Sequence, residues 1–202
     1  MPDAVLLRTE GLTRAYGSLI AVAGVDVSVK RGELRSIIGP NGAGKTTFFR
    51  LISGEEMARL FNLATEGVKA RLAFHICFGN RFGRSRFHRT YAPYFPGVLK
   101  ARAEQFVLEF TSRELSELDL WKRYGEGREL GAGVVDVKGF SQDTPEEVAG
   151  RIRRVLQVCP AERLTVNPDC GFGWSPRYMC NQKLTALAAG AALVRKELAG
   201  QR

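Results

Sequence analysis

The 202-residue sequence contains no run of about 18 consecutive apolar residues, which is the length that a membrane-spanning helix needs. Its first residues, MPDAVLLRTEG, also lack the basic start and the long apolar segment of a signal peptide. We therefore expect no membrane span and a cytoplasmic location. The sequence is 45% hydrophobic and 25% charged, which is the composition of a globular protein long enough to bury the core of one or two domains.

Cysteine is scarce, with four residues spread over the chain: Cys77, Cys159, Cys170 and Cys180. Cysteines so few and so scattered exclude the disulfide framework of a small secreted domain. Cys77 and Cys170 come just after apolar, β-branched runs, which is where site residues are expected. We expect Cys159 and Cys180 to pack as small hydrophobic residues.

Basic charge is plentiful but unevenly distributed. The chain has 30 Lys and Arg against 21 Asp and Glu, a net charge of +9, and residues 57–100 alone hold 8 basic residues against 1 acidic residue. The segment RFGRSRFHR (81–89) interleaves Arg with Phe82 and Phe87, a pattern that can bind phosphates and stack on bases. No nucleic-acid-binding module accompanies it. We therefore expect no nucleic-acid partner and interpret the segment as a solvated loop beside a site for an anionic substrate.

Residues 39–47, GPNGAGKTT, have the pattern of a phosphate-binding loop. Loosely alternating segments at 4–11 and 19–29 predict two strands before it. The segment LRSIIG (34–39) predicts a short buried strand that leads directly into the loop, and a helix begins at Phe48. A strand, a glycine-rich loop and a helix in this order are the context that such a loop requires.

The chemistry of this loop explains its composition. Its glycines allow backbone conformations that aim successive N–H groups at phosphate oxygens. Lys45 would reach the terminal phosphates, and the Thr46 hydroxyl would bind magnesium. The residues expected to hold ATP-Mg are Gly39, Asn41, Gly42, Gly44, Lys45, Thr46 and Thr47.

Residues 1–56 resemble the N-terminal part of an ATP-binding cassette (ABC) transporter ATPase. In that family an aromatic residue near the end of the first strand stacks on adenine, and Tyr16 in RAYGS matches it. The resemblance ends near Glu55. The glutamine loop, the LSGGQ-like signature, the strand ending in Asp-Glu and the switch histidine of the family do not follow. The resemblance therefore implies a truncated fragment that binds nucleotide without hydrolysing it.

From Met57 onward, strand-like and helical segments alternate. Four predicted strands cover 70–78, 105–110, 129–138 and 163–170, and predicted helices cover 96–104, 112–124, 144–158 and 184–200. A repeat of about 30 residues is typical of parallel βα units, and eight such units close a barrel. The fold is thus predicted to be α/β: half of a (βα)8 barrel of four βα units at 57–202, preceded by a truncated, β-rich P-loop fragment at 1–56.

Residues that bind metals stand at the ends of these strands. His75 and Cys77 are two positions apart, so their side chains fall on the same side of an extended segment. Glu109, Asp136 and Cys170 end other strands, and in a parallel barrel these ends form the catalytic face. Each residue alone is more often incidental. Together, one His, one Glu and two Cys make a zinc site that can bind a substrate thiol and lower its pKa.

Residues 57–199 resemble the C-terminal TIM-type barrel of cobalamin-independent methionine synthase through HICFGN, LEFTSRE, DLWKRYG, ELGAGVVDVK and NPDCGFGWSPRYMCNQKL. In that family zinc is held by the His and Cys of H-x-C, a Glu ending the next strand and the Cys of an NPDCG-type loop. The resemblance places these ligands at His75, Cys77, Glu109 and Cys170. It implies zinc as cofactor, a homocysteine-like thiol as acceptor and a methylated folate-like compound as methyl donor.

The larger members of that family carry an Asp-x-His stretch whose histidine is read as a proton donor to the folate. The matching stretch here is Asp136-Val137-Lys138, so the resemblance implies Asp136 and Lys138 as catalytic residues. An exposed lysine has a pKa of about 10.4 and needs burial to act as an acid near neutral pH. The first half of the barrel has no counterpart in the chain, so we expect an oligomer or a partner to cover the open edges.

Three functions stay open. The first is zinc-dependent methyl transfer to a thiol by a methionine-synthase-type enzyme that is incomplete or inactive alone. The second is nucleotide binding by the truncated ATPase fragment, and the third is a non-functional fusion of the two parts. Metal content distinguishes the first function from the second.

Overall fold

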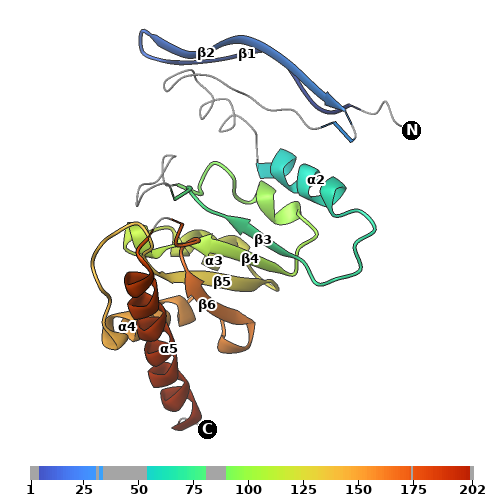
Figure 1. Cartoon of the computed structure of the whole chain (residues 1–202). Helices are drawn as coiled ribbons and strands as arrows, with labels where there is room; N and C mark the ends of the chain where they lie inside the picture. Colours follow the sequence, from blue (N-terminus) through green and yellow to red (C-terminus); the bar gives the residue numbers. More distant parts are fainter. Residues whose placement is uncertain (1–4, 31, 34–53, 81–89, 174, 201–202) are drawn as a thin grey trace.

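The computed structural model describes residues 5–30, 32–33, 54–80, 90–173 and 175–200. The predicted phosphate-binding loop at 39–47 and the Arg-rich segment at 81–89 lie outside these residues. The described residues form two separate sheets, one of two strands and one of four (Figure 1). The four-stranded sheet and its helices make up the mixed α/β part of the chain.

The N-terminal sheet is an antiparallel hairpin, drawn in blue in Figure 1. Its strands are β1 (Val5–Tyr16) and β2 (Leu19–Lys30). They are joined by a tight turn at Gly17, whose φ of 59° is favoured by glycine. Both strands predicted here are present, and β1 runs further than expected. Of the hairpin side chains that the structure describes, only Val22 is buried, so the hairpin contributes little to the core.

The second sheet has four parallel strands in the order β3-β4-β5-β6. They are β3 (Ala73–Ile76), β4 (Gln105–Glu109), β5 (Glu129–Val135) and β6 (Leu164–Pro168). Each lies within a segment that the sequence predicted as a strand, and each is shorter. For example, β5 ends before Asp136, whose carboxylate accepts hydrogen bonds from the backbone N–H groups of Lys138 and Gly139, both at 2.8 Å. These contacts turn the chain out of the sheet.

The two faces of this sheet differ sharply. Residues in register on one face are Phe74, Phe106, Leu130 and Leu164 in one row, and Ile76, Leu108, Ala132 and Val166 in the next. Because strand side chains alternate, the residues between them point the other way. That opposite face is small or polar, with His75, Val107, Gly131 and Thr165 in register. The sheet therefore has one face for a core and one that tolerates water.

Two long helices pack near the apolar face. They are α4 (Pro145–Leu156) and α5 (Arg177–Gly200), both drawn beside the sheet in Figure 1. Their buried apolar residues join those of the strands in one core. At Gly190 the helices approach so closely that a Cβ atom would lie 2.7 Å from the carbonyl oxygen of Pro145. A larger residue at this position would push α5 away from α4.

Shorter helical elements connect the strands. They are α2 (Gly54–Ala64), η1 (Gly97–Lys100), η2 (Thr111–Arg113), α3 (Leu118–Tyr124) and η3 (Ala161–Arg163). The predicted helix at 112–124 is interrupted because Glu114, Leu115 and Glu117 have φ values of 52°, 60° and 67°, which a right-handed helix excludes. The segment at 96–104 forms only the short turn η1. The last helix, α5, starts earlier than predicted.

The start of α4 confirms its prediction from the sequence. The Thr144 hydroxyl accepts a hydrogen bond from the Glu147 N–H at 3.2 Å, and the Glu147 carboxylate accepts one from the Thr144 N–H at 2.7 Å. Pro145 occupies the first turn, where its missing N–H costs nothing. This reciprocal capping box fixes the point at which the chain turns into α4.

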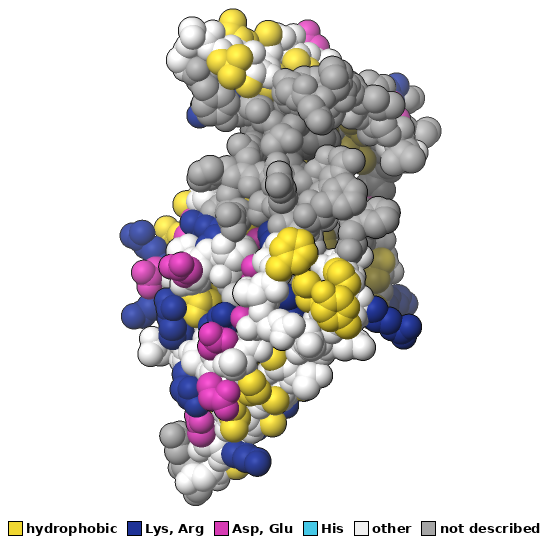
Figure 2. All heavy atoms as spheres, turned by 60° about the vertical axis from the view of Figure 1, so that its left-hand side comes forward, with side chains coloured by type: hydrophobic (Ala, Val, Ile, Leu, Met, Phe, Trp, Pro, Cys, Tyr) yellow, Lys and Arg dark blue, Asp and Glu magenta, His cyan; other side chains and the backbone are white. Residues whose placement is uncertain are grey.

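The surface carries apolar side chains beside mixed charges. Figure 2 shows acidic and basic side chains intermingled on one face, next to a cluster of apolar ones. Among the exposed large apolar residues, Phe140 is 76% exposed and Tyr178 is 62% exposed. Phe140 lies in the segment after β5, and Tyr178 is the second residue of α5, which follows β6. Both residues therefore follow the C-terminal ends of strands.

Glu117 attaches the segment around Tyr91 to the start of α3. Its carboxylate accepts hydrogen bonds from the Thr90 hydroxyl at 2.6 Å and from the Tyr91 N–H at 2.9 Å, and it pairs with the Arg113 guanidinium. Burial on its own raises the pKa of this carboxyl. The hydrogen bonds from Thr90, Tyr91 and Arg113 together outweigh burial and lower the pKa below its ordinary value of 4.5.

We predict that Glu117→Gln lowers the free energy of unfolding by about 1–2 kcal/mol at neutral pH. A group with a lowered folded-state pKa stabilises the protein above the unfolded-state pKa, and this contribution is lost as the pH falls through the folded-state pKa. The difference between the variant and the unmodified chain should therefore shrink as the pH falls below 4.5. Urea unfolding followed by circular dichroism measures it, with Glu114→Gln as control. A difference that does not change with pH would contradict the prediction.

Candidate metal centre

Three side chains with metal-binding atoms meet at the C-terminal edge of the parallel sheet. His75 lies in β3, Cys77 follows it, and Cys170 follows β6. Their ligand atoms all lie within 4.8 Å of one another, and the two sulfur atoms are 3.4 Å apart without forming a disulfide. It is the one such group of three or more His, Cys, Asp or Glu residues in the described part of the chain. Two sulfurs and an imidazole nitrogen are ligands that suit zinc.

The imidazole ring of His75 is oriented by the neighbouring strand. Its Nδ1 atom lies 3.1 Å from the carbonyl oxygen of Val107 in β4. A ring that donates its Nδ1 proton to this carbonyl keeps Nε2 as the atom that can bind a metal. The backbone of β4 therefore fixes both the direction of the ring and the nitrogen it offers.

The hydroxyl of Tyr91 joins the ends of β3 and β4. It donates a hydrogen bond to the carbonyl oxygen of Ile76 at 2.9 Å and accepts one from the Glu109 N–H at 2.7 Å. The tyrosine is 2% exposed, and burial raises the pKa of its hydroxyl well above 10.0, so it stays protonated. Tyr91 therefore holds the end of β3, which precedes Cys77, beside the end of β4, which carries Glu109.

Asn80 joins the segment after β3 to the loop that follows β6. Its amide nitrogen donates to the carbonyl oxygen of Gly171 at 2.9 Å and to that of Val137 at 3.4 Å. Gly171 directly follows Cys170, and Asn80 is three residues beyond Cys77. The contact therefore keeps the two cysteine-bearing segments together.

Glu109 and Lys138 form a buried ion pair in the same region. The Lys138 ammonium lies 2.5 Å from a Glu109 carboxylate oxygen, and the two side chains are 5% and 0% exposed. The Ser112 hydroxyl donates to the same oxygen at 2.7 Å, and the Phe78 N–H donates to the other at 3.2 Å. The Glu109 carboxylate is thus held by three donors, including a full positive charge. It is not a member of the group formed by His75, Cys77 and Cys170.

Asp169, next to Cys170, is fully buried and binds the backbone at the end of β4. Its carboxylate accepts hydrogen bonds from the N–H groups of Phe110 and Thr111 at 3.0 Å and of Ser112 at 2.8 Å. Burial raises the pKa of this carboxyl from 3.8 to about 7, against the lowering effect of the backbone N–H groups. Gly133 makes the approach possible, since a Cβ there would lie 2.3 Å from an Asp169 oxygen.

The other predicted site residues have separate places. Asp136 lies just beyond β5 and holds the backbone N–H of Lys138. Tyr16 ends β1 in the hairpin, and the predicted ATP-Mg residues between Gly39 and Thr47 lie outside the described residues. Cys159 is buried as expected, whereas Cys180 is only half-buried and its thiol donates to the Ser175 carbonyl.

Sequence reasoning missed the residues that assemble the site. They are Asn80, Tyr91, Ser112, Gly133 and Asp169. Asp169 had a signal, because it stands inside the NPDCG motif beside the cysteine that was identified. Asn80, Ser112 and Gly133 also stand inside quoted motifs, but those motifs give no sign of the contacts. Asn80, Tyr91 and Gly133 contact segments that are distant in sequence, whereas Ser112 donates to Glu109 three residues before it.

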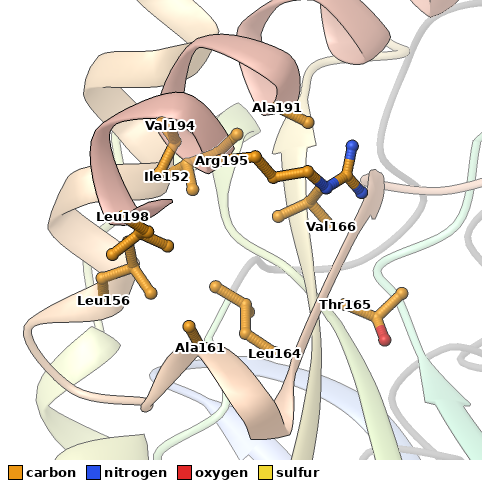
Figure 3. A pocket seen from close by; sticks show the side chains of 10 residues that line it. All are labelled: Ile152, Leu156, Ala161, Leu164, Thr165, Val166, Ala191, Val194, Arg195 and Leu198. Atoms are coloured by element: carbon orange, nitrogen blue, oxygen red, sulfur yellow. The ribbon is translucent and has the colours of Figure 1, made fainter. Parts of the chain in front are cut away.

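A cavity of about 280 Å³ lies away from this group, between α4, α5 and the start of β6. It is lined mainly by apolar side chains, with the Arg195 side chain extending along one wall (Figure 3). Leu164 in its wall is the first residue of β6, whereas Cys170 comes after the last. The cavity is therefore at the opposite end of that strand from the candidate metal ligands.

Among the described residues, no helix combines the length and the apolar character needed to cross a membrane.

Comparison with known proteins identifies two parts. Residues 56–192 match the family model of the cobalamin-independent synthase catalytic domain, and residues 22–69 match that of the ABC transporter domain. Both resemblances inferred from the sequence are thereby confirmed. The two matches overlap over residues 56–69.

Individual relatives agree with the larger match. Methionine synthase of Saccharolobus solfataricus is 39% identical over 137 residues, and that of Thermococcus kodakarensis is 38% identical over 138 residues. Each alignment covers 68% of this chain but 38% of the relative. The solved structure of a B12-independent methionine synthase from Shewanella sp. W3-18-1, in complex with selenomethionine, matches with a TM-score of 0.61 and 30% identity. That match covers 72% of this chain and 44% of the Shewanella chain.

The chain therefore spans less than half the length of the relatives it matches. Its C-terminal part nevertheless has a mixed α/β fold with a parallel sheet, similar to that of the Shewanella structure. Since the matching family model covers more than half of its residues, the chain belongs to the family of the cobalamin-independent synthase catalytic domain.

Proposed function

We propose that residues 57–202 carry a zinc site of the methionine synthase type, which activates a homocysteine-like thiol to accept a methyl group from a methylated folate-like donor. The observation that carries the proposal is the convergence of His75, Cys77 and Cys170, whose ligand atoms lie within 4.8 Å of one another. His75 lies in the first strand of the sheet and Cys170 follows the last, so it is the fold that brings them together. Family membership supports the same function.

The donor atoms fit zinc by number and type. Zinc in catalytic sites takes three protein ligands and leaves a position for water or substrate. When bound, it lowers the pKa of a thiol that occupies that position. The chain supplies the orientation: Val107 directs the His75 ring, and Asn80 holds the loop of Cys170. The resemblance assigns a further ligand, Glu109.

Lys138 and Asp136 have the places that the resemblance gives to the proton-donating stretch. The Asp136 carboxylate accepts a hydrogen bond from the Lys138 N–H and so positions Lys138 after β5. The Lys138 side chain is 5% exposed, and its ammonium lies 2.5 Å from a Glu109 carboxylate oxygen. We propose proton donation to the methyl donor as its role in a complete enzyme.

We propose that the parallel sheet is half of a (βα)8 barrel that needs further strands. Its order is sequential, and within the described residues β3 and β6 each have one strand neighbour. Eight strands close such a barrel. The small, polar face with Val107, Gly131 and Thr165 would then line the interior. An oligomer or a partner that supplies strands would cover both edges.

The metal proposal predicts about one zinc ion per chain. Cys77→Ser and Cys170→Ser should each lower the zinc affinity by about tenfold or more, because each removes a thiolate ligand. Cys159→Ser and Cys180→Ser are the matched controls, since both replace a cysteine outside the group. Elemental analysis after dialysis, with competition against a chromophoric chelator, measures the difference. Equal zinc binding by all four variants would contradict the assignment.

The activity proposal predicts little methyl transfer by the 202-residue chain alone. The reaction needs the methyl group held in line with the sulfur, and the strands expected to hold the donor have no counterpart in this chain. A fusion that places the first half of a relative's barrel before Met57 should raise stability, and methionine formation should become measurable. The assay follows methionine formed from homocysteine and a methylated folate. Robust turnover by the unmodified chain would refute the proposal that it lacks parts needed for activity.

Nucleotide binding is the second candidate function, and the match of residues 22–69 to the ABC transporter domain supports it. We predict weak, Lys45-dependent binding of ATP-Mg without steady hydrolysis. The loop at 39–47 supplies phosphate contacts, while the parts that position the attacking water are missing from the sequence. A titration with a fluorescent ATP analogue, for the unmodified chain and for Lys45→Ala, tests it. Hydrolysis that Lys45→Ala abolishes would show that the fragment is a complete ATPase.

A further inference from the structure

The thiols of Cys77 and Cys170 face each other at the C-terminal edge of the parallel sheet. Cys77 follows β3 and Cys170 follows β6, which are the two outer strands of this sheet within the described residues. Neighbouring strands are about 4.8 Å apart, so a flat sheet would separate these two segments by roughly three such spacings. The sulfur atoms are nevertheless 3.4 Å apart, although the residues lie 93 positions apart in the sequence. Their meeting therefore requires a strongly curved sheet.

The two sulfur atoms are close to the distance of a covalent bridge. A disulfide has an S–S bond of about 2.05 Å, so the sulfurs need to approach by only about 1.4 Å. Rotation about the Cα–Cβ bonds moves a sulfur atom through distances of this size. The hydrogen bonds from Asn80 to the Gly171 carbonyl oxygen and from Tyr91 to the Ile76 carbonyl oxygen hold the backbone beside each cysteine. The folded chain therefore brings the two thiols together before any reaction takes place.

The other two cysteines lack this arrangement. Cys159 is buried, whereas Cys180 is half-buried like Cys77 and Cys170. The Cys180 thiol, however, donates to the Ser175 carbonyl oxygen at 3.6 Å. Among the described residues, the contact between Cys77 and Cys170 is the one hydrogen-bonding contact that joins two sulfur atoms. The pair therefore combines a partner thiol with access for a small oxidant.

We propose that Cys77 and Cys170 are a site of reversible oxidation, at which hydrogen peroxide forms a disulfide in the metal-free chain. One thiol attacks a peroxide oxygen, which gives a sulfenic acid and releases one water. The second thiol attacks the sulfenic sulfur, forms the S–S bond and releases a second water. The two sulfurs together lose two electrons, the peroxide gains them, and both thiol protons leave in water. A dithiol reductant reverses the reaction by thiol–disulfide exchange.

The bridge would exclude a metal ion from the candidate metal centre, and this consequence rests on the proposed function. The thiolate is the form of cysteine that binds metals, and a disulfide has none to offer. Of the three grouped residues, only His75 would then keep its ligand atom. A bound zinc ion, conversely, would occupy both thiolates and slow their attack on peroxide. The pair would thus couple the binding of metal to the redox state of the chain.

The experiment oxidises the full chain with a small molar excess of hydrogen peroxide, after reduction and removal of metal. Peptide mapping by mass spectrometry should find a bridge between Cys77 and Cys170, and a thiol reagent should count two free thiols per chain instead of four. Cys180→Ser is the matched control, because it removes a half-buried thiol outside the pair and should form the same bridge. Cys77→Ser should form none. Oxidation in concentrated urea should give mixed pairs, because the selectivity comes from the fold.

Zinc provides the second measurement. The zinc-loaded chain should lose its thiols at least about tenfold more slowly than the metal-free chain, because the metal holds both thiolates. The bridged chain should take up zinc only after a dithiol reductant has been added, as measured by competition with a chromophoric chelator. Equal zinc binding by the bridged and the reduced chain would refute the coupling.

The outcomes separate this inference from the proposed function. Oxidation that leaves Cys77 and Cys170 unbridged, as free thiols or as sulfinic acids, would overturn the inference. The proposed function would stand if the reduced chain still binds zinc. Pairing as mixed in the folded chain as in urea would also overturn the inference. A reduced chain that binds no zinc but forms the bridge would overturn the proposed function and the coupling to metal, and the oxidation site would stand.

Discussion

The buried carboxylate of Asp169 joins the end of β6 to the end of β4 across the intervening strand. It accepts three backbone N–H groups from residues 110–112, and it passes over Gly133, where a side chain would collide with it. Because Cys170 is the next residue, this contact also sets the position of that thiol. The candidate metal group therefore depends on a residue that contributes no ligand atom, and Asp169 and Gly133 form one structural unit.

The rest of the C-terminal edge extends the same principle. Tyr91 joins β3 to β4, and Asn80 joins the segment after β3 to the loop after β6. The Glu109–Lys138 pair lies among these contacts with both side chains buried. Moving Tyr91, Glu109 or Lys138 would leave a buried polar group without a hydrogen bond, so this part of the edge is rigid. Such rigidity is what a metal site with thiolate ligands requires.

The two faces of the sheet explain how a chain shorter than half of its relatives can keep this edge. One face is apolar and is packed with α4 and α5 in a single core. The other face is small or polar, so exposing it costs less than exposing rows of leucine or phenylalanine would. Within the described residues, β3 and β6 are the edge strands of this sheet, and an open strand edge favours pairing with another chain. In the part of the chain that the structure describes, the core is formed by the four strands and the helices that pack on their apolar face.

The sequence by itself determined the type and the approximate place of the four strands, because alternating apolar residues survive in each of them. It also determined the start of α4 at Thr144, whose capping box is local. Short motifs pointed to His75, Cys77 and Cys170 as candidate metal ligands, and these three lie together in the structure. Only the tertiary structure decided the breaks before α3, the roles of Asp169 and Tyr91, and the pairing of Lys138 with Glu109. These features join residues up to 59 positions apart, as between Phe110 and Asp169. The NPDCG motif marks Asp169 as a residue of interest but not its partners, since these contacts arise only when the strands have been brought side by side.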